Sequence, residues 1–125
     1  MFMEKILKQI EQWEKLEKIL DLDNFENIYW KDKGWRKKHE FEKIKSASAL
    51  RKVYDAYLDI YDKDNYKIEK QIWIAKVAYQ EKRKILPDGF TKFIKWVINK
   101  LSKEDFKKFL EVFVAYHKYF NPQAK

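Results

Sequence analysis

The sequence predicts an all-α fold, a single compact bundle of five or six helices formed by residues 1–125. At this length one domain buries roughly two-thirds of the surface of its unfolded chain, which is enough for a real core. Apolar residues make up 46% of the chain and aromatic residues 18%, so the core is expected to consist largely of rings. The chain has two Gly and two Pro, too few for the turns of a many-stranded β protein, so helices are expected.

The first helix is predicted over residues 3–20, where apolar side chains recur every three or four positions. A short second helix is expected to begin at Asp23 or Asn24 and to run through Tyr29 and Trp30. The apolar face of the first helix contains Ile6, Leu7, Ile10, Trp13, Leu16, Ile19 and Leu20.

A break at Gly34 separates these helices from a basic segment, residues 35–47, which is interpreted as a loop or a short helix. Ser46 or Ser48 is then expected to cap a helix that runs to about Asp62. Its predicted apolar stripe contains Leu50, Val53, Tyr54, Tyr57, Leu58 and Tyr61.

The third quarter of the chain predicts a central helix over residues 66–86, after a turn at residues 63–66. Apolar residues lie around much of its circumference, a pattern typical of a buried helix. One stripe contains Ile68, Ile72, Ala75 and Tyr79, and other stripes contain Ile74, Val77, Ala78 and Ile85.

Two helices complete the predicted bundle after Pro87, Asp88 and Gly89 end the central one. The first contains the apolar residues Phe90, Phe93, Ile94, Val97, Ile98 and Leu101. Ser102 and Asp105 have the spacing of a capping box, so they are expected to begin the last helix. Its stripe contains Phe106, Phe109, Leu110, Phe113 and Val114, and its end places Tyr116 and Phe120 one turn apart as a packed pair.

Charge points to the class of partner. The formal net charge is +8, with −3 in residues 1–32 and +11 in residues 33–125, which favours a nucleic acid. The chain has no Cys, which fits a reducing compartment, and it shows neither a signal peptide nor an apolar run of about 20 residues. We therefore expect a cytoplasmic protein with no membrane partner.

Catalytic patterns are missing from the sequence. His39 and His117 stand outside any metal-binding spacing, so they are interpreted as packing or capping residues. Both Gly are isolated, which excludes a Gly-rich phosphate loop. Asp55, Asp59 and Asp62 have helical spacing that could share a metal, although such acids usually form a solvated face. We expect a protein that is not an enzyme and has no cofactor and no metal.

Two basic groups are candidates for phosphate contact. Lys76 and Arg83 lie nearly two helical turns apart, about 10 Å, with Tyr79 between them. Either they contact one nucleic-acid strand while Tyr79 stacks, or Tyr79 is part of the core and the cations reach solvent at its edge. The second group surrounds the expected helix start, where the positive end of the helix dipole also favours an anion; alternatively, its charge only maintains solubility. It contains Lys45, Arg51 and Lys52.

Three blocks in order resemble the small-subunit family of type III-A CRISPR interference complexes, the second Csm subunit. They read SASALRKVYDAYLDIYDK, IAKVAYQEKR and VFVAYHKYF, and the last is the most specific. They extend over residues 46–120, and no further block that resembles the family is evident in residues 1–45. The chain departs from the family pattern at Lys82, where a small residue or Gly is common, and at Asn121 and Pro122, where a Gly-containing tail is common.

The resemblance implies a non-catalytic subunit whose copies stack as the inner filament of a ribonucleoprotein. Its partners would be the crRNA and target RNA, the backbone and large subunits of the complex, and further copies of itself. The expected RNA-binding residues, Lys52 included for its place at the helix start, are Lys45, Arg51, Lys52, Lys76, Arg83 and Lys118.

Two other functions stay open. One is a helical protein-interaction domain that makes no direct contact with nucleic acid. The other is a helix-turn-helix regulator, although no helix pair with a tight turn before a recognition helix is evident. Self-association is also expected, because Trp13, Trp30 and Trp35 exceed what a small bundle needs and would form an exposed patch.

Overall fold

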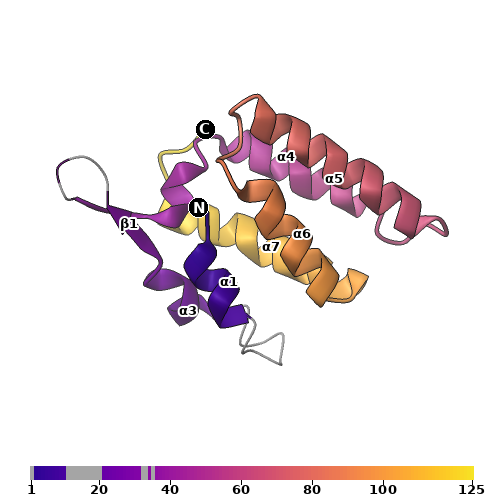
Figure 1. The fold of residues 1–125 in the computed structure, drawn as a ribbon, viewed down its shortest axis with the longest axis horizontal. Helices are drawn as coiled ribbons and strands as arrows, with labels where there is room; N and C mark the ends of the chain where they lie inside the picture. The colour runs from indigo at the N-terminus through magenta and orange to yellow at the C-terminus, as the bar shows by residue number, and fades with distance from the viewer. Residues whose placement is uncertain (1, 11–20, 32–33, 35) are drawn as a thin grey trace.

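The structure is a computed structural model that describes residues 2–10, 21–31, 34 and 36–125, and these residues are mostly helical, which confirms the predicted fold class (Figure 1). A small two-stranded sheet and one 3-10 helix accompany the α-helices. The elements are α1 (Glu4–Ile10), α3 (Leu22–Glu26), β1 (Tyr29–Lys31), β2 (Lys37–His39), η1 (Glu40–Lys43), α4 (Ala47–Leu58), α5 (Tyr66–Lys82), α6 (Phe90–Lys100) and α7 (Lys103–Phe120).

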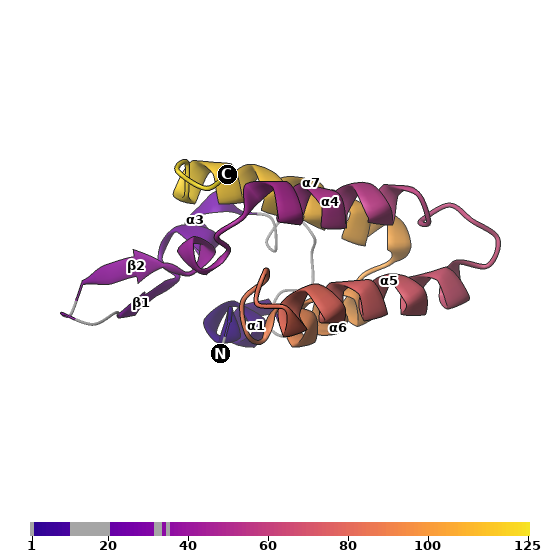
Figure 2. The same cartoon turned by 90° about the horizontal axis from the view of Figure 1, so that it is seen from above.

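The main helices form two layers. Helices α4 and α7 lie side by side in one layer, and α1, α5 and α6 form the other (Figure 2). Aromatic rings fill the space between them, as the composition predicts. Phe93 and Phe113 lie 5.6 Å apart between ring centroids, and Tyr57 of α4 packs edge-on against Trp73 of α5 at 5.2 Å. Such ring pairs add to the free energy gained from burying their apolar area.

The hairpin formed by β1 and β2 corrects the prediction that a helix continues through Tyr29 and Trp30. Tyr29 pairs with His39 and Trp30 with Lys38 in antiparallel register. The aromatic residues of β1 favour a strand once a partner is present, but that partner comes from the basic segment, which was expected to be a loop or helix. This segment forms β2 and then η1, and the hairpin projects from the helices (Figure 1).

Two predicted helix starts agree with the observed caps, whereas α3 begins at Leu22 after an Asp21 cap, ahead of the predicted Asp23 or Asn24. The Ser46 hydroxyl accepts a hydrogen bond from the Ala49 amide at 3.1 Å, so Ser46 rather than Ser48 caps α4. Ser102 caps α7 by accepting from the Asp105 amide at 3.2 Å. Helix α4 ends at Leu58, before the predicted Asp62, and α5 ends at Lys82, before the predicted Leu86.

The prediction that α5 is a central helix is wrong. Only Trp73 and Val77 of this helix are buried, and both face its neighbours. Ile68 is 64% exposed, Ile72 46% and Tyr79 60%. The helix therefore packs on one face and presents a second apolar stripe to solvent. The spacing of apolar residues in the sequence does not show which of the two faces is buried.

The N-terminal residues belong to the core. Phe2, Met3 and Ile6 are fully buried, and the Phe2 ring lies 5.5 Å from those of Phe90 and Phe93. Residues 11–20 of the predicted first helix lie outside the described residues. None of the helices that the structure describes is both long and apolar enough to cross a membrane.

Candidate nucleic-acid interface

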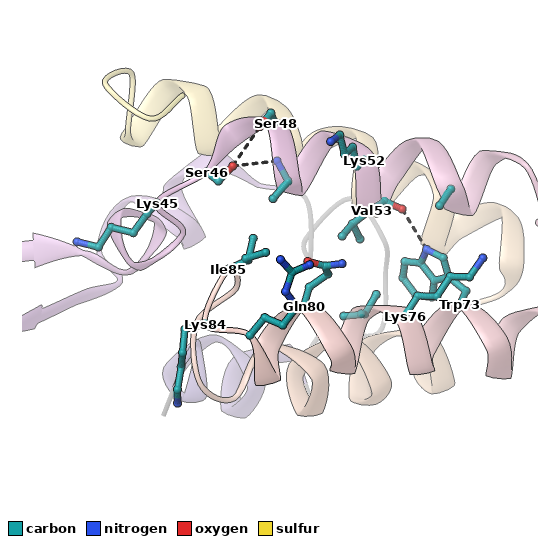
Figure 3. Close-up of a pocket in the computed structure, with 14 residues that line it drawn as sticks. Lys45, Ser46, Ser48, Lys52, Val53, Trp73, Lys76, Gln80, Lys84 and Ile85 are labelled. Carbon is teal, nitrogen blue, oxygen red and sulfur yellow. Dashed lines mark hydrogen bonds between the residues drawn. The ribbon is translucent and has the colours of Figure 1, made fainter.

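A groove with a volume of about 680 Å³ lies between α4 and the C-terminal half of α5, and we call it the α4–α5 groove (Figure 3). Its floor is apolar and includes Val53, Trp73 and Val77, which are all buried. Ser46, Ser48 and Gln80 add polar atoms to the walls. The groove thus combines an apolar base with a polar rim, the usual composition of a binding surface.

Among the residues that the structure describes, five cations line this groove and no Asp or Glu does. They come from two separate stretches of the chain and are all exposed: Lys45, Lys52, Lys76, Arg83 and Lys84. Like charges on facing walls repel one another, so their mutual interaction disfavours this arrangement in the isolated chain. The same cations reinforce one another in attracting an anion placed between them.

Hydrogen bonds fix the shape of the groove. The Trp73 indole Nε1 donates to the backbone carbonyl of Val53 at 3.0 Å, which ties α5 to α4 beneath the cations (Figure 3). At the far end, Lys84 has a φ of 65°, in the left-handed region that residues with a Cβ rarely adopt. This turn ends α5 and lets Ile85 line the groove.

The cations of the groove have few competing partners. Lys45, Lys52 and Lys76 form no ion pair with any residue that the structure describes. Arg83 lies over the Tyr79 ring, 5.5 Å from its centroid, and Lys84 pairs with Asp88 at 3.0 Å in an exposed position. Exposed ion pairs contribute little free energy, so Lys84 is also available to an anion.

Four of the six predicted RNA-binding residues meet in this groove, namely Lys45, Lys52, Lys76 and Arg83. Arg51 does not line it, and its guanidinium lies 3.5 Å from the Asp55 carboxylate on the exposed face of α4. Lys118 is exposed on α7 and also lies outside the groove.

Two further expectations about the groove region change. Tyr79 is exposed rather than part of the core, so the interpretation of Lys76 and Arg83 as cations at the edge of a buried Tyr79 is wrong. The start of α4 has fewer free amides than expected, because the Ser48 amide donates to the backbone oxygen of Lys125 at 3.3 Å and the Ala49 amide donates to the Ser46 hydroxyl.

Lys84 is the groove cation that the sequence reasoning missed. It follows Lys82 and Arg83 directly, and this basic run was the available signal. On a continuous helix Lys84 would project 100° away from Arg83. The left-handed turn changes that direction, and the sequence pattern does not show the turn.

The two histidines pack in the interior as neutral rings. His39 Nε2 donates to the Phe25 carbonyl at 2.6 Å, and His39 Nδ1 accepts from the Phe41 amide at 3.2 Å. His117 Nε2 donates to the Ile44 carbonyl at 2.8 Å. Burial lowers the pKa of both imidazoles. They have the packing and capping role that the sequence predicts.

The remaining candidates give mixed outcomes. No cluster of three or more metal-ligating side chains occurs among the residues that the structure describes. Trp30, expected in an exposed patch, is half-buried, and the Lys43 ammonium lies 5.1 Å from its ring centroid. Trp13 and Trp35 lie outside the described residues. Tyr116 and Phe120 do pack as a pair, edge to face at 6.2 Å.

Comparison with known proteins gives a family match. A family model described as Csm2 Type III-A matches residues 31–123, about three quarters of the chain. The match includes β2, the whole basic segment and every residue that lines the α4–α5 groove. No curated protein and no solved structure gives a significant match to the chain.

Proposed function

Because the chain belongs to the Csm2 Type III-A family, and is therefore a subunit of a type III-A Csm complex, we propose that it holds the RNA backbone in the α4–α5 groove. In this role its copies stack as the inner filament beside the crRNA and target RNA. It carries out no catalysis, works in the cytoplasm, and contacts the backbone and large subunits of the complex.

The observation that carries the proposal is the convergence of five cations from two stretches of the chain on one groove that no described Asp or Glu lines. Lys and Arg side chains that face phosphates give affinity without reading sequence, which suits a subunit of a complex whose specificity comes from base pairing. The apolar floor can take the sugar edge or an unpaired base, while Ser48 and Gln80 offer hydrogen bonds.

Salt dependence tests this contact directly. Binding of the full chain to a guide–target RNA duplex is measured by fluorescence anisotropy at several salt concentrations. Each phosphate contact contributes about −0.9 to the slope of log K against log salt. Lys76→Ala with Arg83→Ala should make the slope less negative by about 2 and weaken binding at 0.1 M salt by roughly 50-fold.

A matched control separates groove contact from overall charge. Lys92 and Lys95 on α6 are exposed and lie outside the groove, so their double Ala variant loses the same charge. It should keep most of the affinity and most of the slope. Equal losses in both double variants would show that the groove is not the RNA site.

The alternative, a protein-interaction domain without RNA contact, makes a different prediction. The groove variant would then bind the other Csm subunits and protect RNA within the reconstituted complex as well as the unaltered chain does. Protection inside the complex is the appropriate measurement because several linked sites raise the apparent affinity of each weak one.

A further inference from the structure

The outer face of α5 carries an apolar stripe that no described residue covers. It contains Ile68, Ile72, Ala75 and Tyr79, which are all exposed. Their spacing of four, three and four residues keeps them within about 60° around the helix. Helix α5 runs along the edge of the molecule, so a partner can approach this stripe (Figure 1).

The stripe is complementary to itself. When a second α5 lies antiparallel across it, Ile68 faces Tyr79 of the second copy and Ile72 faces Ala75. A large residue then meets a small one at the centre, which suits the close packing of two helices. The same register places Lys82 opposite Asn65, so no like charges meet at the ends of the stripe.

Charge on the flank of the stripe favours the same register. Glu69 and Lys76 lie seven residues apart on one side of it, the side that borders the α4–α5 groove. In the antiparallel pair, Glu69 of each copy lies near Lys76 of the other, and two-fold symmetry makes this pair twice. The Glu69 carboxylate accepts an exposed hydrogen bond from the Asn65 side chain at 3.3 Å, which it can exchange.

We propose that free copies of this chain pair through α5 as a two-fold antiparallel dimer. Both flanks that carry Lys76 then lie on the same side, so the two grooves form one basic surface. A symmetric contact of this kind closes after two copies and cannot extend into a filament. The proposal therefore goes beyond the filament role, and its test does not depend on RNA contact.

Sedimentation of the full chain over about a hundredfold range of concentration tests the pairing. One helix per copy makes a small interface, so we expect a reversible dimer. Ile72→Glu should weaken it at least about 30-fold, because it places two charges at the centre of the contact. Its helical circular dichroism should match that of the unaltered chain, since Ile72 is 46% exposed.

A charge swap tests the register. Glu69→Lys alone and Lys76→Glu alone should each weaken the dimer about fivefold, and the double swap should restore it. The double variant still loses the Lys76 charge from the groove, so it should bind RNA more weakly even though its dimer is restored. Dimer formation and RNA contact can therefore be tested separately.

Three results would overturn the pairing. The first is a monomer at the highest concentration, and the second is a dimer that Ile72→Glu leaves intact. The third is a failure of the double swap to restore what the single swaps weaken. A monomer whose Ile72→Glu variant no longer joins the other Csm subunits would assign the stripe to one of those subunits instead.

Discussion

Two buried imidazoles link distant segments of this protein. His117 on α7 and the Asn121 amide both donate to the Ile44 carbonyl, which holds the segment before α4 against the end of α7. His39 stacks on Phe120, with ring centroids 3.8 Å apart, while it bonds to the backbone of α3. A proton added to His39 would remove the acceptor at Nδ1, so the interior favours the neutral ring.

These histidines should make stability depend on pH. Burial lowers the pKa of both imidazoles below the ordinary value of 6.5, so just below pH 6.5 the unfolded chain binds more protons than the folded one. The contribution of the two neutral imidazoles to stability is therefore fully present above their pKa in the unfolded chain. It is lost as the pH falls through their pKa in the folded chain. We expect a loss of about 1–2 kcal/mol in the free energy of unfolding, measured by urea denaturation, from about pH 7.5 to pH 5.5.

A variant identifies the source of this pH dependence. His117→Gln keeps a side-chain N–H group near the Ile44 carbonyl but cannot titrate. Its stability should change less over the same pH interval, and the double variant with His39→Gln should change least. An unchanged pH dependence in the double variant would assign the effect to other groups.

At the scale of single elements, the connection between α5 and α6 depends on a side chain rather than on the turn sequence alone. The Glu81 carboxylate accepts hydrogen bonds from the amides of Gly89 at 3.2 Å and Thr91 at 2.6 Å. It thereby provides a hydrogen-bond acceptor for the free amides at the start of α6. Gly89 at this position has a φ of 93° and offers no side chain to cap the helix. The negative charge also complements the positive end of the α6 dipole.

Glu81→Ala should therefore lower the free energy of unfolding by about 2 kcal/mol, because two amides lose a charged acceptor. Glu81→Gln, which keeps an acceptor oxygen, should lose less. Glu111→Ala, an exposed glutamate on α7, should change stability by less than about 0.5 kcal/mol. Similar losses for Glu81→Ala and Glu111→Ala would contradict the capping role.

Element prediction succeeded where local chemistry dominates and failed where a distant segment decides. Ser102 and Ser46 cap their helices because the hydroxyl and the amide that it accepts from are three residues apart. Tyr29 and Trp30 form a strand because residues 37–39 lie beside them. A partner from across the basic segment cannot be read from periodicity in one window.

At the scale of the whole molecule, the N-terminal residues complete the hydrophobic core of the region that the family model matches. They themselves lie before that region. Phe2 is 1% exposed and contacts the rings of Phe90 and Phe93, and the Met3 amide donates to Glu40 at 3.3 Å. The matched region, residues 31–123, would expose these rings if the N-terminal residues were removed.

Phe2→Ala should thus lower the free energy of unfolding by about 3–5 kcal/mol, since it leaves a cavity between aromatic rings that cannot fully collapse. Urea denaturation at neutral pH measures the loss. Phe2→Leu, which fills most of the space, should lose less than half as much. A loss below about 1 kcal/mol for Phe2→Ala would show that the N-terminal residues contribute little to this core.

The sequence by itself determined the helical fold class, most helix starts, the family resemblance and the basic character of residues 33–125. These properties depend on composition, local spacing or caps within a few residues of each other. Only the tertiary structure decided which cations share a groove. Lys45, Lys52, Lys76 and Arg83 meet because Trp73 ties α5 to the α4 backbone, while Arg51 turns to another face of the same helix.

The burial of α5 was also decided by the tertiary structure. Its sequence contains two apolar faces, and nothing local distinguishes the face that packs on α4 and α6 from the face that stays in solvent. That distinction is set by the neighbouring helices, which bury Trp73 and Val77 and leave Ile68, Ile72 and Tyr79 in solvent. Apolar periodicity indicates that a helix face can be buried. The arrangement of the whole chain determines which of the apolar faces is buried and against which neighbour.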